Sequence, residues 1–488
     1  MTARAVGRVA LASVAIWAAA PREARAYDFS IDLRTIGQGY QVRGFSPTGA
    51  SILMSRRRLT QTLNLNVFNI EPDSWRESEG RARASDENVL YVDASLRFDT
   101  DFGGYMLGRP TGTDEIRELQ QSQVDVLYAF LGGRRLAGRL DFQLGRQIHF
   151  DLVDFYSFDG ADVLVRASRA FAVEAFGGTE VRGEAPVSSP VYELDGTSAG
   201  SRDPATRPDQ NSELRPMAGA ALVVGADGDL PVMARVSYRR MWSATADMQP
   251  GEPDSGVNDE KLAATASAQW ARRLFLTAGV RYNLLLAAFD DEQLALRVRA
   301  SARQSFGVEM AYLAPSFDGD SIWNVFSSGA YRDARANWDL AFGDGWKVYA
   351  RAFARHFDDA DGEITAPGAA LRWAGGGSAG LSWRRTRGVV RGDAYWDDGF
   401  GGRKAGVDIS GRWQARRALE LEGRVTGYVW RSDQHPDTDA GFVLGAQAGA
   451  RYRLGDGVRL HVLAEDNVGT FYTGQYRALA VIEMNASL

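Results

Sequence analysis

Cysteine is absent from all 488 residues, which excludes disulfides, thiolate metal sites and a thiol nucleophile. Lysine occurs only at positions 261, 347 and 404, so the basic side chains are almost all arginine. Beyond the N-terminus no run reaches about eighteen uninterrupted apolar residues, so no membrane-spanning helix is predicted. The net charge of −6 disfavours a nucleic-acid partner. Glycine (53 residues) and aromatics (11%) are abundant, which suits turns, close strand packing and interfacial belts.

The N-terminus has the pattern of a secretory signal peptide. Arg4 and Arg8 precede an apolar run over residues 9–20, and the Ala-Arg-Ala sequence at 24–26 fits a small-residue cleavage site. The run is too short to cross a bilayer as a helix, and its flanks disfavour the alternative of a buried helix. We expect residues 1–26 to be removed on export, so that the mature chain starts at Tyr27.

Alternation of apolar and polar residues dominates the rest of the chain. From Leu90 to Asp99 the residues Leu, Val, Ala, Leu and Phe alternate with Tyr, Asp, Ser, Arg and Asp. A period of two over about ten residues is typical of a β-strand. Similar runs lie at 63–68, 124–131, 139–144, 163–166, 232–239, 294–301, 346–355, 407–412, 419–425, 458–465 and 476–488.

The connections between these runs fall into two classes. Tight turns are predicted at 132–133, 227–229, 343–345, 375–377, 416–417 and 455–457, and long polar loops at 101–119, 178–216, 244–260, 314–324, 358–365, 397–403 and 431–440. Short periplasmic turns alternating with long extracellular loops are expected of an outer-membrane barrel. Residues 178–216 could instead be an interdomain linker, but strands of the same period resume after them.

The sequence therefore predicts an all-β protein, a transmembrane antiparallel up-and-down β-barrel of roughly 18–22 strands over residues 27–488. A soluble propeller would show a motif recurring every 40 to 50 residues or so, and none is present. Aromatic residues that suit interfacial girdles are Trp242, Trp323, Trp346, Trp373, Trp396, Trp430 and Tyr476. The expected partners are outer-membrane lipid and the barrel-assembly machinery, although the last residue is Leu488 where such barrels commonly end on an aromatic.

The hairpin at 139–168 carries a family resemblance. Its Leu144-Gly145-Arg146-Gln147 run is followed by Phe158-Asp159-Gly160 and a returning strand. This hairpin resembles those of alginate-export-type porins, and exopolysaccharide-export barrels of similar size are equally compatible. The resemblance implies a barrel that passes anionic polysaccharide through an arginine-lined lumen. It covers this hairpin alone, so no other residue role is carried over.

If the apolar faces meet lipid, the alternating polar residues point into the lumen. The predicted pore-lining residues are Arg97, Arg139, Asp141, Arg235, Arg239, Arg297, Arg299, Arg351, Arg355, Arg412, Arg424, Glu420 and Glu422. Guanidinium groups stay charged at any relevant pH, and rings of such charges set ion preference in pores. The alternative is that cross-strand pairs of arginine with carboxylates merely fill and rigidify the wall.

Catalytic, metal and cofactor sites are not predicted. His149 with Asp151 and Asp154 could imitate the rim site of a barrel hydrolase, but no serine stands at the offset that a lipase needs. The acidic stretch 358–362 lacks the full spaced ligand set of a calcium loop, so a solvated loop is favoured.

The function that the sequence favours is an outer-membrane channel of a Gram-negative bacterium. It would pass polar, anionic solutes or a polysaccharide chain. The alternative is a non-conducting barrel that serves as an anchor, an adhesin or part of a surface complex, with the loop at 178–216 making the contacts.

Overall fold

The computed structural model describes residues 28–49, 51–68, 70, 89–101, 123–153, 155–181, 215–225, 231–242, 256–314, 330–358, 372–400, 402–432 and 440–487. The predicted signal peptide 1–26, the turn 227–229, nearly all of the loop 178–216 and Leu488 lie outside these residues. Within them no helix is long and apolar enough to cross a membrane.

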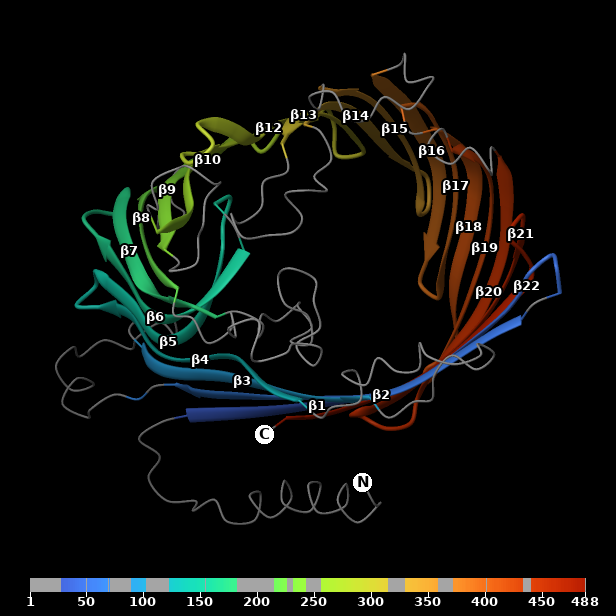
Figure 1. The fold of residues 1–488 in the computed structure, drawn as a ribbon, viewed down its shortest axis with the longest axis horizontal. Coiled ribbons are helices and arrows are strands. Elements are labelled where there is room, and N and C mark those ends of the chain that lie inside the picture. The colour runs from blue at the N-terminus through green and yellow to red at the C-terminus, as the bar shows by residue number, and fades with distance from the viewer. Residues whose placement is uncertain are drawn as a thin grey trace, which may run out of the picture.

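In the described part of the chain, twenty-two antiparallel strands form one closed barrel, seen as a ring in Figure 1. Each strand pairs with its neighbours in sequence, and the ring closes where β1 pairs with β22 over Asp32–Phe45 and Gly474–Ser487. The strands are β1 (Asp28–Phe45), β2 (Ser51–Phe68), β3 (Val89–Asp101), β4 (Gln123–Leu136), β5 (Leu140–Phe150), β6 (Phe155–Arg166), β7 (Phe171–Glu180), β8 (Pro216–Val224), β9 (Val232–Trp242), β10 (Val257–Trp270), β11 (Leu274–Asn283), β12 (Ala288–Arg299), β13 (Gln304–Leu313), β14 (Tyr331–Phe342), β15 (Trp346–Phe357), β16 (Trp373–Arg385), β17 (Gly388–Gly399), β18 (Gly402–Arg416), β19 (Leu419–Ser432), β20 (Gly441–Arg453), β21 (Val458–Gly469) and β22 (Tyr472–Ser487). The predicted fold class is confirmed, at the upper end of the predicted strand number.

The two ends of the barrel differ in their connections. One end carries mainly short connections such as 137–139, 271–273 and 386–387. The other end carries long ones such as 181–215 and 358–372, together with short ones such as 46–50, 284–287 and 470–471. The stretch 69–88 departs from this rule, because it joins β2 to β3 at the end with the short turns. The predicted long loop at 397–403 is wrong, since β17 runs to Gly399 and β18 starts at Gly402.

Two predicted glycine turns are also wrong, because these glycines lie inside strands. Gly132 and Gly133 belong to β4, where a Cβ atom would collide with the rings of Tyr91 and Phe142. The turn follows at 137–139 instead. Residues 375–377 likewise lie within β16, and a Cβ at position 376 would collide with the carbonyl oxygen of Trp396. Glycine is needed at these positions for close approach within the sheet and not for reversal of the chain.

One face of the sheet is an apolar wall. Along β12 and β13 the side chains of Leu294, Leu296, Val298, Val308 and Met310 are each between 38% and 55% exposed. Paired strands keep these residues on the same side, since Leu294 lies opposite Met310 and Leu296 opposite Val308. Such a continuous exposed apolar band is what a lipid-facing barrel wall requires.

Candidate functional site

The face opposite the apolar wall lines the inside of the barrel. On β11, the Nη1 atom of Arg281 donates a hydrogen bond to the carbonyl oxygen of Leu152, in the turn between β5 and β6, over 3.3 Å. Strands so far apart in the ring can meet only across its interior. Because the register is fixed, the face that holds Arg281 continues onto β12, where it includes Arg297 and Arg299.

Two adjoining cavities of about 900 Å³ and 1000 Å³ lie along this inner face between β11 and β21. They share Asp339 and Arg351, so they form one continuous open part of the lumen. The charged side chains that line it are Arg297, Arg299, Glu309, Arg335, Asp339, Lys347, Arg351, Arg384, Arg391, Asp397, Arg412, Glu422, Arg424, Arg451 and His461. The predicted residues Arg297, Arg299, Arg351, Arg412, Arg424 and Glu422 are among them, and Glu420 lines a smaller cavity beside Arg412.

Five of the lining arginines have no carboxylate within salt-bridge distance in the described part of the chain. Arg297 is hydrogen-bonded only to Ser305, at 3.4 Å, and the guanidinium groups of Arg299 and Arg351 lie over the rings of Phe275 and Tyr349. The other two are Arg384 and Arg412. One row of paired residues crosses four strands. It runs from Arg297 on β12 through Gly307 on β13 and Asn337 on β14 to Arg351 on β15. Small or neutral residues therefore separate the two guanidinium groups, whose positive charges stay uncompensated by direct pairing.

Other predicted arginines are paired, as the alternative reading of a rigidified wall requires. Arg355 donates to Asp333 at 2.6 Å, and Arg424 donates to Asp408 at 2.5 Å. Glu420 and Glu422 both pair with Arg451. The polar face of the barrel thus contains compensated pairs as well as the five arginines without carboxylate partners.

The remaining predicted residues lie away from this open part. Arg139 is in the turn at 137–139, Asp141 is paired with Arg166 on β6 at 2.6 Å, and Arg97 is on β3 opposite Thr62. Arg235 donates two hydrogen bonds of 2.7 Å to Glu174. Arg239 is only 3% exposed, against Asp259.

Strands β5 to β9 enclose a packed sector instead of open space. In Figure 1, teal strand ends of this region reach into the ring. Its centre is an apolar cluster of Tyr156, Phe158, Phe176, Met217 and Met241, all at most 5% exposed. An apolar cluster on the lumen side of a barrel shows that this sector is filled by its own side chains. The lumen is therefore partly closed and partly open.

A row of glycines creases the sheet where the β5–β6 hairpin turns inward. Gly145 faces Gly160, and Gly160 faces Gly178 on β7. Gly145 has a φ of 130°, and a Cβ atom on Gly160 or Gly178 would collide with the backbone of the adjacent strand. Only glycine tolerates such close backbone approach.

The hairpin residues that carry the family resemblance surround this crease. Gln147 and Phe158 face each other beneath it and are fully buried. On the opposite face, Arg146 donates to both carboxylate oxygens of Asp159 at 2.8 and 2.9 Å. In this chain the motif therefore shapes the bend of the wall, and none of its charged side chains faces the open cavities.

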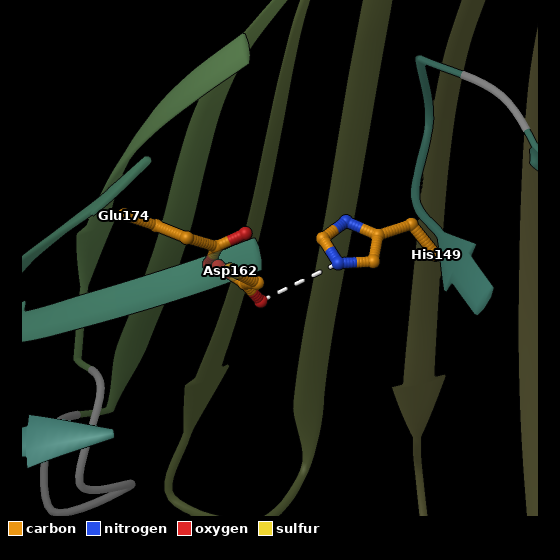
Figure 2. Close-up of side chains that lie close together, drawn as sticks. All are labelled: His149, Asp162 and Glu174. Carbon is orange, nitrogen blue, oxygen red and sulfur yellow. Dashed lines mark ion pairs between the residues drawn. The ribbon is translucent and has the colours of Figure 1, made fainter. Parts of the chain in front are cut away.

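The bend brings together residues far apart along the strands. In Figure 2, His149 of β5 points toward Asp162 of β6 and Glu174 of β7. The Nε2 atom of His149 lies 3.4 Å from a carboxylate oxygen of Asp162, and its Nδ1 atom lies 3.3 Å from the hydroxyl of Tyr156. Among the described residues, the carboxylate that lies beside His149 is that of Asp162; Asp154 lies outside them.

The acidic stretch at 358–362 is described only at its first residue. Asp358 accepts from His356 at 3.2 Å and lies 3.4 Å from Arg332. Its partners are thus cationic or polar side chains of β14 and β15.

Sequence reasoning missed Arg335 and Arg391, which also line the open part. Arg335 stands in β14, within a region where no strand could be assigned from the pattern. Arg391 stands in β17 between two valines and a glycine. Alternation of inward and outward residues along β14 and β17 would have placed both arginines on the inner face, if the boundaries of these strands had been known.

No family model and no curated protein matches the sequence. Solved structures with a similar outline include OccAB4 of Acinetobacter baumannii, with 6% identity, 96% of this chain and 100% of that chain covered, and a TM-score of 0.43. The outer membrane protein OpdK of Pseudomonas aeruginosa has 12% identity, coverage of 94% and 99%, and a TM-score of 0.42. OccK2 (OpdF) of the same species, in complex with glucuronate, has 10% identity, coverage of 94% and 98%, and a TM-score of 0.41. None of the three is described as an alginate exporter, and likeness at this level carries no inference about this chain's function.

Proposed function

We propose that this chain is an outer-membrane channel of a Gram-negative bacterium that passes polar, anionic solutes or an anionic polysaccharide chain. The observation that carries the proposal is the group of five arginines on the open lumen face without carboxylate partners among the described residues: Arg297, Arg299, Arg351, Arg384 and Arg412. An uncompensated guanidinium attracts anions and can pair carboxylates bidentately. The proposal includes export behind a cleaved signal peptide at 1–26 and assigns no catalytic role to the barrel.

The direct test is single-channel recording of the purified, folded protein in planar lipid bilayers. We expect stepwise conductance with a reversal potential in a KCl gradient that indicates preference for chloride over potassium. Glucuronate and an alginate oligosaccharide, added in turn, should show which anion size enters, through transient block. A preparation that inserts into the bilayer yet gives no conductance would contradict the channel proposal. It would favour the alternative of an anchor or adhesin.

Asp333→Asn should increase the preference of the channel for anions over cations. Asp333 is 4% exposed and accepts hydrogen bonds from Arg335 and Arg355, so its neutralisation leaves two guanidinium groups without a charged partner. We expect greater anion preference and a fall of about 1–3 kcal/mol in the free energy of unfolding. Reversal potentials and urea unfolding of the detergent-solubilised barrel measure the two effects. Asp358→Asn is the matched control, because its partners Arg332 and His356 lie on the face opposite Asp333, and it should leave the reversal potential unchanged.

A further inference from the structure

We propose that His149, Asp162 and Glu174 form a binding site for one divalent transition-metal ion of the zinc class. The ion would fasten the inward-folded tip of the β5–β6 hairpin to the barrel wall (Figure 2). The three residues come from three adjacent strands, and their ligand atoms lie within 4.8 Å of one another. This site is independent of whether the barrel conducts.

The distance between His149 and Asp162 fits a shared ion better than a hydrogen bond. Their Nε2 and carboxylate oxygen atoms are 3.4 Å apart, beyond the usual range for an N–H···O hydrogen bond. Two ligand atoms of a tetrahedral zinc ion, each about 2.0–2.1 Å from the metal, lie about 3.4 Å apart. This pair therefore already has the separation that an ion between them would need, whereas the Glu174 oxygen lies within 4.8 Å of both atoms and has to move closer.

The polar atoms of Asp162 lack the partners that a buried carboxylate normally has. Its Oδ1 atom is buried without any hydrogen-bond partner, and His149 is its only ion-pair partner in the described residues. Burial of an unsatisfied carboxylate oxygen is costly, so a cation bound there would relieve the cost. Gln147, on the same face of β5 as His149, is fully buried, and neither of its amide atoms has a hydrogen-bond partner among the described residues. Buried polar atoms in this sector therefore outnumber the partners available to them.

The second ring nitrogen of His149 is held as metal sites usually require. Its Nδ1 atom lies 3.3 Å from the hydroxyl of Tyr156, and the ring packs against Phe158 and Phe176 at 5.0 Å between centroids. When Nδ1 donates its proton to this hydroxyl oxygen, Nε2 carries the lone pair that binds a metal. The aromatic neighbours fix the orientation of the ring.

The main interaction that competes with metal binding is the one between Arg235 and Glu174. Arg235 holds Glu174 through two hydrogen bonds of 2.7 Å and also lies 3.6 Å from Asp151, so one guanidinium charge is shared between two carboxylates. An ionised carboxylate has about four lone-pair positions, so Glu174 can accept from Arg235 and still offer an oxygen to a metal. One imidazole with two carboxylates suits zinc and similar first-row ions, whereas magnesium and calcium prefer oxygen ligands alone.

Isothermal titration of Zn²⁺ into the EDTA-stripped, folded full-length barrel in detergent tests the site. We expect one ion per chain, with affinity reduced at least about tenfold by His149→Gln and by Asp162→Asn. The matched control is His461→Gln, which alters another lumen histidine that lies 2.6 Å from a carboxylate, Glu422. That variant should bind zinc as the unmodified protein does.

Two outcomes would overturn the proposal: no zinc binding by the unmodified barrel, or equal affinity in the His149 and Asp162 variants. Gel mobility with and without heating shows whether each variant is folded. If a variant fails to fold, Co²⁺ added to the unmodified protein still tests the proposal. A bound Co²⁺ ion with nitrogen and oxygen ligands should show ligand-field absorption that differs from that of the free ion. A spectrum identical to that of Co²⁺ in buffer would refute the site.

Discussion

Valine in place of Gly160 is expected to prevent the β5–β6 hairpin from folding into the lumen. Gly160 lies at the crease between Gly145 and Gly178, and a Cβ atom there would collide with the carbonyl oxygen of Gly177. This oxygen belongs to the backbone of a paired strand, so it cannot move aside as the end of a flexible side chain can. We expect the free energy of unfolding to fall by at least about 1–3 kcal/mol, the usual cost of overpacking.

Urea unfolding of the detergent-solubilised barrel measures that loss. Where the variant still assembles, its conductance should rise, because the hairpin tip that fills one sector of the lumen can no longer bend inward. Gly392→Val is the matched control: a Cβ at this glycine of β17 meets nothing within 4 Å. Equal stability of the Gly160 and Gly392 variants would show that the crease does not depend on glycine.

Replacing Arg297, Arg299 and Arg351 together by serine is expected to abolish or reverse the preference for anions. These residues line the open lumen and have no carboxylate partners in the described chain, so each substitution removes one uncompensated positive charge. A unit charge about 7 Å from a permeating ion in water contributes about 0.6 kcal/mol, or roughly threefold in local concentration. Salt screening with a Debye length of about 8 Å reduces this.

Reversal potentials at low and high salt measure the effect, which should shrink as salt rises. The matched control is the double variant Arg424→Ser with Asp408→Asn, which removes one charge of each sign from a paired site. It should change selectivity little, since the pair is already compensated. If the triple variant keeps the reversal potential of the unmodified protein, these arginines do not set selectivity.

The sequence predicted the barrel well because the signal is local. A lipid-facing wall needs only an apolar residue at every second position, so alternation along Leu90–Asp99 and its counterparts was enough to indicate the strands. Glycine was misread for the same reason. At Gly132 and Gly376 the requirement for glycine comes from Tyr91 and Trp396 of neighbouring strands, which a local pattern cannot show.

The same limit applies to the candidate site. Alternation placed Arg297, Arg299 and Arg351 on the inner face, but it could not distinguish them from Arg355, whose charge is compensated by Asp333. Pairing depends on strand register, and register depends on every strand in the ring. Arg235 and Arg239 were predicted on the same basis, yet they belong to the packed sector.

The chain by itself determined that it would form an antiparallel barrel with an apolar outer face and an arginine-rich inner face. That much follows from the period of two and the absence of long apolar runs. Only the tertiary structure decided that the 139–168 hairpin bends inward at a row of glycines. That bend brings His149 to Asp162 and Glu174 and leaves the open lumen to β11–β21. The physical reason is that close approach and charge compensation are properties of neighbouring strands, which lie together only once the ring has closed.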